Sequence, residues 1–120
     1  MNDMDVPKVS VVICTRDRCD GIASAARSVL SNKYPSFELR IVDQGNDDEA
    51  KNCLFPFLDG HRVFYHRSAT IGLARGRNIG IATAKGEVIA LTDDDCVVEP
   101  DWLDEFVAAF AIDPRIEIVI

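Results

Sequence analysis

The feature that most constrains this chain is the alternation of short, apolar, β-branched runs with longer segments of helical periodicity. The first run, KVSVVICT (Lys8–Thr15), is almost continuously apolar, which predicts a strand buried on both faces. The segments between such runs carry apolar residues every three or four positions, as amphipathic helices do. This alternation predicts βαβ units, and therefore an open, mostly parallel, Rossmann-like α/β sheet with helices on both faces.

Turn residues and composition set the expected bounds of the strands and helices. Strands are expected over Lys8–Thr15, Phe37–Asp43, Arg62–Arg67, Glu87–Asp93 and Arg115–Ile120. Helices are expected over Cys19–Asn32 and Glu99–Pro114. A weaker helix is expected to start at the polar stretch QGNDDE, to run through Leu54 and Phe55 and to be interrupted by Pro56. The segment Gly72–Gly86 is expected to be a loop that runs into a helix. Asp20 is expected to cap the first helix, and Pro100 suits the first turn of the last one.

The fifth strand stops at the last residue, Ile120. A terminal apolar strand needs a neighbour, so we expect the 120 residues to be the truncated, N-terminal part of a larger domain. The same unpaired strand could join two chains as a homodimer.

Composition excludes several classes of function. Asp and Glu number 20 against 13 Lys and Arg, a net charge of -7, which argues against a nucleic-acid partner.

The four cysteines contain no C-x-x-C pair, so we expect reduced, buried thiols in a cytoplasmic protein and no zinc site. The start, MNDMDVPK, is not a signal peptide, and no apolar run approaches the roughly 20 residues of a membrane span.

Polar residues gather where the expected strands end. Thr15 and Asp17 follow the first strand, Asp43 ends the second, and the aspartate triplet (Asp93, Asp94 and Asp95) follows the apolar run VIALT. If the first strand lies between the second and the fourth, these groups share the edge of the sheet where α/β proteins bind ligands. Three adjacent carboxylates repel one another, so a cation or a set of donors is expected beside them.

The chemistry of this edge suits a metal-bridged nucleoside diphosphate. Carboxylates accept hydrogen bonds from a nucleoside and coordinate a divalent ion that also holds phosphate oxygens. The segment ARGRNIG places Arg75 and Arg77 just before an expected helix, where both charge and backbone N–H groups favour an anion. Taken singly, Asp17 and Asp43 also fit a helix cap or a turn, and the arginines a solvated turn.

Four segments in order, VSVVICTRDR, IVDQGND, GLARGRNIGIA and ALTDDDCVVEPDWLDEF, resemble the inverting glycosyltransferase family 2, which has the GT-A fold. The resemblance extends over residues 9–120 and implies transfer of a sugar from a nucleoside diphosphate donor to an acceptor hydroxyl. It implies that this chain is the donor-binding part of such a domain, without the acceptor-binding part.

The resemblance also implies roles for individual residues. Thr15, Asp17 and Asp43 resemble the family's contacts to nucleobase and ribose, and Arg77 resembles a residue near the base and diphosphate. The family's D-x-D motif falls on the aspartate triplet: Asp95 and Asp93 would hold Mn²⁺ or Mg²⁺, and Asp93 and Asp94 would also contact the donor. A UDP- or GDP-linked sugar is the expected ligand, bound in the cytoplasm or at the cytoplasmic face of a membrane.

The sequence departs from the family pattern in two places. Gln44 stands where a second acid is common, which leaves the nucleobase open, and Arg75 stands where a small residue is common. The family's catalytic base lies in a later segment, so we expect no catalytic residue in these 120 residues and no sugar transfer by them alone.

Two other readings fit part of the sequence. DDDCV resembles the D-x-D-x-[TV] motif of haloacid-dehalogenase-like phosphatases, in which Asp93 would be the nucleophile and Asp95 its acid/base partner. That motif, however, follows the first strand of the phosphatase core, whereas here it follows the fourth. A non-catalytic module that binds nucleotide or metal is the other alternative; a receiver-like domain would need its acidic pair after the first strand.

Overall fold

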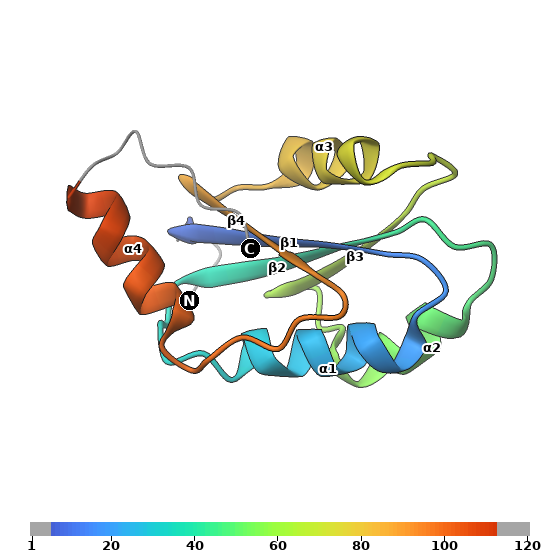
Figure 1. Ribbon diagram of the computed structural model, residues 1–120, viewed down its shortest axis with the longest axis horizontal. Helices are drawn as coiled ribbons and strands as arrows, with labels where there is room; N and C mark the ends of the chain where they lie inside the picture. The colour runs from blue at the N-terminus through green and yellow to red at the C-terminus, as the bar shows by residue number, and fades with distance from the viewer. Residues whose placement is uncertain (1–5, 113–120) are drawn as a thin grey trace.

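The computed structural model describes residues 6–112 as an alternating series of strands and helices (Figure 1). The strands are β1 (Val9–Thr15), β2 (Phe37–Asp43), β3 (Val63–Arg67) and β4 (Val88–Asp93). The helices are α1 (Cys19–Leu30), α2 (Glu49–Leu54), the 3-10 helix η1 (Phe55–Phe57), α3 (Leu73–Thr83) and α4 (Trp102–Ile112). The first four expected strands and all four helices are confirmed with modest changes in their bounds. The fifth expected strand, Arg115–Ile120, lies outside the described residues.

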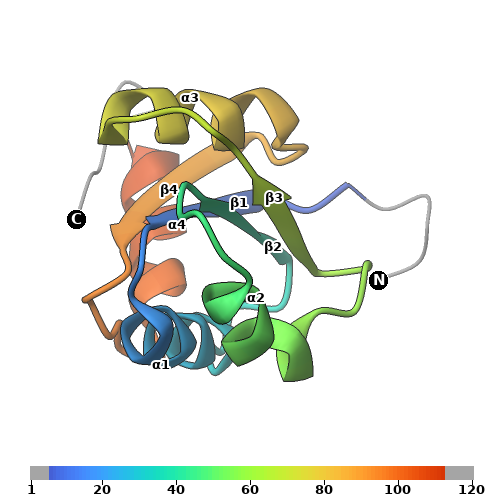
Figure 2. The ribbon, with the colours of Figure 1, turned by 90° about the vertical axis from the view of Figure 1, so that its right-hand side faces the viewer.

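The four strands form one parallel sheet in the order β3-β2-β1-β4. β1 therefore lies between β2 and β4, as the shared-edge hypothesis requires. The register pairs Thr15 with Asp43 and Cys14 with Asp93, so three strands end side by side. α3 covers one face of the sheet and α1 and α2 cover the other, while α4 lies at the end where the strands begin (Figures 1 and 2). The opposite end carries the polar loops.

The face toward α1 and α2 is apolar. Every residue of β1 and β2 is buried, and alternate positions such as Val11, Ile13, Leu39 and Ile41 enter one hydrophobic core. α1 fits this face because its buried residues recur at helical spacing: Ile22, Ala25, Ala26 and Val29.

The face toward α3 is polar at its centre. Arg40 and Glu38 form a buried ion pair, with 2.8 Å between the Arg40 Nη2 and Glu38 Oε1 atoms. The Ser10 hydroxyl and the Lys85 backbone N–H also donate to Glu38 Oε2, over 2.6 and 2.8 Å. These bonds compensate the burial of the Glu38 charge, which a bare ion pair does only in part.

Two expectations about α1 are wrong. Asp20 does not cap the helix; Arg18 occupies the N-cap position and Asp20 lies in the first turn, where its charge still favours the helix dipole. Cys19 and Cys53 are not reduced thiols but form a disulfide, with Cα atoms 5.7 Å apart. They are 34 residues apart in sequence, and only the packing of α1 against α2 brings them together.

The remaining cysteines are free, and of these Cys14 is buried. Within residues 6–112, no helix has the length and apolar content that crossing a bilayer requires.

Candidate functional site

An open pocket of about 490 Å³ lies at the edge where β1, β2 and β4 end. It is lined by Cys14, Thr15, Arg16, Arg18, Gln44, Gly72, Leu73, Asp93, Asp94 and Asp95. Thr15 and the whole aspartate triplet are thus brought together, as the sequence predicts. Asp17, Asp43 and Arg77 are not part of the lining.

Arginines neutralise the outer members of the aspartate triplet. Arg77 of α3 places Nη2 at 3.3 Å from Asp93 Oδ1. Arg18, at the start of α1, places Nη1 at 3.7 Å from Asp95 Oδ2. The two cations come from opposite faces of the sheet, so the fold supplies the positive charge that the triplet requires.

Asp94, the middle member, is turned inward. Its Oδ2 accepts a hydrogen bond of 2.9 Å from the Thr15 hydroxyl, which ties the end of β4 to the end of β1. Burial, together with the charges of Asp95 and Asp93, raises the pKa of Asp94, although Thr15 and Arg18 act in the opposite direction. Asp94 is therefore better suited to hold the pocket wall than to coordinate an ion.

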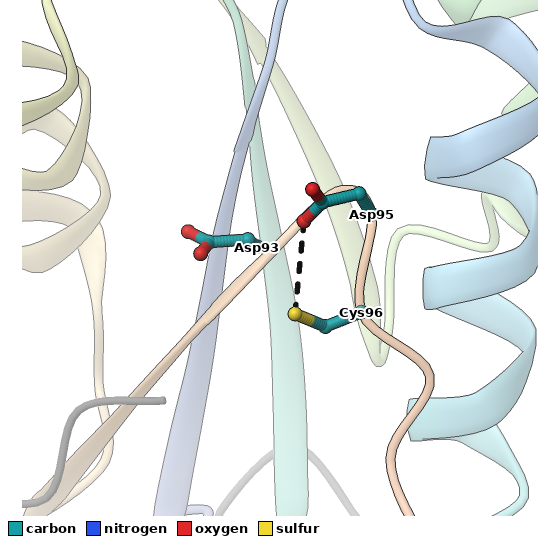
Figure 3. A group of neighbouring side chains, drawn as sticks. All are labelled: Asp93, Asp95 and Cys96. Carbon is teal, nitrogen blue, oxygen red and sulfur yellow. Dashed lines mark hydrogen bonds between the residues drawn. The ribbon is translucent and has the colours of Figure 1, made fainter.

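Asp93, Asp95 and Cys96 form a cluster that could hold a metal ion. Each offers one ligand atom, and the three atoms lie within 4.8 Å of one another. Figure 3 shows Asp93 and Asp95 on either side of the chain at the end of β4, with the Cys96 thiol directed toward Asp95. Two solvent-accessible carboxylates are typical ligands of Mn²⁺ and Mg²⁺, so these ligand atoms fit the cation that the sequence predicts.

Asp43 is almost completely enclosed, with 1% of its surface exposed. Its Oδ1 accepts a hydrogen bond of 2.8 Å from the Gly45 backbone N–H, and its Oδ2 accepts one from the Tyr65 hydroxyl. Burial and the neighbouring Asp43 carboxylate raise the pKa of Tyr65 to about 12, so the phenol stays protonated and donates. Asp43 stabilises the turn after β2 as well as lying near the pocket.

Asp17 lies in the loop between β1 and α1 with a left-handed backbone, at φ 57°. Aspartate tolerates this conformation better than most residues. Its side chain is exposed, and its Oδ2 lies 3.8 Å from Arg16 Nε. A ligand can reach this carboxylate without displacing buried groups.

α3 begins at Leu73, earlier than the sequence indicates. Arg75 and Arg77 consequently lie within the helix and not in a loop before it. Arg77 is half-buried and contacts Asp93, whereas Arg75 is exposed. Of the two arginines, only Arg77 is placed to contribute to the site.

Sequence reasoning missed Arg18, Tyr65, Cys96 and Cys14 as residues of the site, and it noted Gln44 only for its effect on the nucleobase. Adjacency to Asp17 and to the triplet could have indicated Arg18 and Cys96, but nothing in the sequence signals the contact between Tyr65 and Asp43. Cys14 lies in the pocket wall, where burial raises the pKa of its thiol to about 11 and keeps it neutral.

Comparison with solved structures identifies the fold. A mannosyltransferase from Pyrobaculum calidifontis, solved with GDP-Man and Mn²⁺, matches with a TM-score of 0.81 at 22% identity over 94% of this chain and 34% of its own. S. aureus TarS 1-349, solved with UDP-GlcNAc, matches with a TM-score of 0.78 at 21% identity over 88% of this chain and 31% of its own. Both are GT-A glycosyltransferases, so the sheet and helices have the GT-A arrangement.

Sequence relatives agree with the structural ones. A glucosyl-dolichyl phosphate glucuronosyltransferase of Haloferax volcanii is 34% identical over 110 residues, which cover 89% of this chain and 35% of the relative. Glycosyltransferase GlyG of Streptococcus pneumoniae is 26% identical over 80% of this chain and 33% of its own. The chain thus spans about a third of these relatives. The family model Glycosyl transferase family 2 matches residues 10–119, which sets aside the phosphatase and receiver alternatives, and the chain belongs to glycosyltransferase family 2.

Proposed function

We propose that residues 1–120 form the donor-binding part of a glycosyltransferase that moves a sugar from a nucleoside diphosphate to an acceptor hydroxyl. The observation that carries this proposal is the metal-type cluster of Asp93, Asp95 and Cys96 at the mouth of a pocket in a family 2 chain. Acids alone would repel a diphosphate, so a divalent cation between them is the arrangement that electrostatics favours.

In this proposal Asp95 and Asp93 hold Mn²⁺ or Mg²⁺. The ion, when bound, neutralises charge on the departing nucleoside diphosphate. Asp95 suits this role because 63% of its side chain is exposed, and Asp93 because 40% is. Arg77 and Arg18 balance these acids before a ligand binds, and their guanidinium groups suit phosphate oxygens when one does.

Thr15, Asp17, Asp43, Arg77, Asp93 and Asp94 are proposed to bind the donor. Asp17 is exposed and free to accept hydrogen bonds from ribose or base. Asp43 is enclosed, but each carboxylate oxygen has two acceptor positions, so it keeps capacity for a base N–H beside its bonds to Gly45 and Tyr65. The two relatives solved with UDP-GlcNAc and GDP-Man support a UDP- or GDP-linked sugar as the donor class.

Cytoplasmic location and homodimer formation, both expected from the sequence, stay proposals. The Cys19–Cys53 disulfide opposes the first, because cytosolic thiols are generally kept reduced.

Calorimetric titration of UDP and GDP tests the proposal, in the presence of Mn²⁺ and again with a chelator. We expect binding that requires the ion and weakens about tenfold or more in Asp95→Asn. Asp104→Asn, an exposed acid on α4, is the matched control and should bind like the unmodified chain. Folded protein that binds neither nucleotide with Mn²⁺ contradicts the proposal, and equal binding with and without the ion contradicts the metal's role.

A further inference from the structure

Gln44 makes an unusual set of contacts beside the pocket. Its side chain is buried, with 9% of the residue exposed, and its Nε2 faces three acceptors. These are the Gly72 carbonyl at 3.0 Å, the Thr70 hydroxyl at 3.1 Å and the Thr70 carbonyl at 3.2 Å. All three belong to the segment that connects β3 to α3, and Gly72 also lines the pocket.

The opposite side of the same amide supports the first turn of α3. A Cβ atom added at Gly76 would lie 2.8 Å from Gln44 Oε1 and 2.9 Å from the Cys14 thiol. α3 therefore rests directly on these two side chains, which only a glycine at position 76 permits. Through its backbone N–H, Gln44 also donates to the Thr15 carbonyl over 2.9 Å. One residue thus joins β1, the segment before α3 and α3 itself.

The contacts require an amide and not an acid. A carboxylate at this position has no proton to donate at neutral pH and would direct negative charge at the carbonyl oxygens of Thr70 and Gly72. An apolar side chain of the same size would fill the space but take the donor away from the Thr70 carbonyl, and it would leave the Gly72 carbonyl only its bond from the Gly76 N–H. The glutamine at position 44 therefore has a structural reason in this chain.

We propose that Gln44 is a positioning residue, which holds residues 70–72 and the start of α3, and with them Arg77, against the donor pocket. The part of this inference that concerns a ligand rests on the proposed function. Arg77 follows Gly76 directly and contacts Asp93, so a displacement of α3 would be transmitted to the metal-type cluster.

The test compares Gln44→Met and Gln44→Glu with Asn32→Leu. Asn32 is an equally buried amide, which donates to the Glu99 carbonyl and accepts from the Leu103 N–H, far from the pocket and beside α4. Amide hydrogen exchange of residues 70–77 and the affinity for UDP and GDP with Mn²⁺ are measured for each variant. Melting temperature shows whether each variant is folded.

We expect Gln44→Met to speed exchange in residues 70–77 and to weaken nucleotide binding roughly threefold to tenfold, with Gln44→Glu weaker still. Asn32→Leu should lower the melting temperature without either effect. Met behaving like Gln would overturn the inference, because it would reduce Gln44 to a space-filling role. If the unmodified chain binds no nucleotide, the proposed function fails, and so does the part of the inference that concerns a ligand. The claim that Gln44 holds residues 70–77 in place is tested separately, and unchanged amide hydrogen exchange of these residues in Gln44→Met would overturn it.

Discussion

The two faces of the sheet are built on different principles, and neighbouring residues of β2 show the contrast. Leu39 faces α1 and α2, is fully buried, and belongs to the hydrophobic core. Glu38, the preceding residue, faces the α3 side and is 2% exposed, yet it accepts hydrogen bonds from Ser10, Arg40 and Lys85. Equal burial is therefore achieved once by apolar packing and once by a network of hydrogen bonds around an ion pair.

The difference explains where stability and function lie. Apolar packing is non-directional, so the α1 face can stabilise the fold without fixing one exact helix position. Hydrogen bonds and close glycine contacts are directional, so the α3 face fixes the helix that carries Arg77. We infer that the α1 face determines stability and the α3 face determines the geometry of the pocket.

The largest expected effect on stability concerns the disulfide on the α1 side. Cys19 and Cys53 close a loop of 34 residues, which corresponds to about 4 kcal/mol in the chain-entropy model. Replacing both by serine should lower the free energy of unfolding by about this amount, measured by urea denaturation. In denaturant without reductant, only the free thiols of Cys14 and Cys96 should react. Reaction of all four cysteines would contradict the disulfide and support the reduced, cytoplasmic prediction.

Leu39→Ala should cost about 3 kcal/mol of stability, because it removes a fully buried side chain from the α1 face. Val97→Ala, at a residue that is 72% exposed, is the control and should change stability by less than about 0.5 kcal/mol. Nucleotide affinity of the folded Leu39 variant should be unchanged. A loss of affinity would break the proposed division between the two faces.

Gly80→Ala tests the α3 face and should cost about 2 kcal/mol. In an open helix the same change would stabilise, but here the new Cβ would collide with the side chain of Val12. Combining it with Val12→Ala should recover part of the loss, which a double-mutant cycle of urea denaturation curves can measure. Unlike Leu39→Ala, Gly80→Ala should also weaken nucleotide binding, because α3 must move to accommodate the new Cβ. Stability equal to the unmodified chain would contradict the close approach of α3.

The smallest expected effect is a difference in pH dependence between two buried acids. Burial by itself would raise the pKa of Glu38, but hydrogen bonds from Arg40, Ser10 and Lys85 outweigh it and hold that pKa below its ordinary value of 4.5. The stability that Glu38 contributes is therefore present above its unfolded pKa and is lost as pH falls through the folded one. Asp94 has the opposite sign, since its pKa is raised and acidification relieves the cost of its buried charge.

Urea denaturation between pH 7 and pH 3 checks these signs. Relative to the unmodified chain, Glu38→Gln should lose less stability on acidification, and Asp94→Asn should lose more. Parallel curves for all three proteins would contradict the contrast between the two acids.

The sequence predicted the fold well because strand and helix periods are local properties. The run KVSVVICT and the spacing of Ile22, Ala25, Ala26 and Val29 led directly to β1 and α1. The ends of the helices were harder to predict. For example, α3 begins at Leu73, inside a segment rich in glycine and arginine that the sequence indicated to be a loop. The shared edge followed from one assumption about strand order, which the structure confirms.

The site was predictable only in part, because contacts between distant residues leave no local signal. The triplet and Thr15 stand out at strand ends, but the Cys19–Cys53 pair and the bonds of Gln44 to Thr70 and Gly72 depend on tertiary packing. Asp43 shows that a residue singled out from the sequence can also have a structural role that the sequence does not indicate. Its position at the end of β2 indicated a ligand contact, yet the structure also gives it a role in holding the turn at Gly45.

The most direct test of the account is to locate the cation on the folded chain. Substoichiometric Mn²⁺, added with UDP or GDP, broadens the NMR signals of nearby backbone amides. The account predicts broadening centred on residues 93–96 and extending to residues 15–18, and its loss in Asp95→Asn. Asp59, an acid in the loop before β3 that bonds three backbone N–H groups, should keep its signal. Broadening centred on Asp59, or unchanged in Asp95→Asn, would contradict the claim that the aspartate triplet holds the metal.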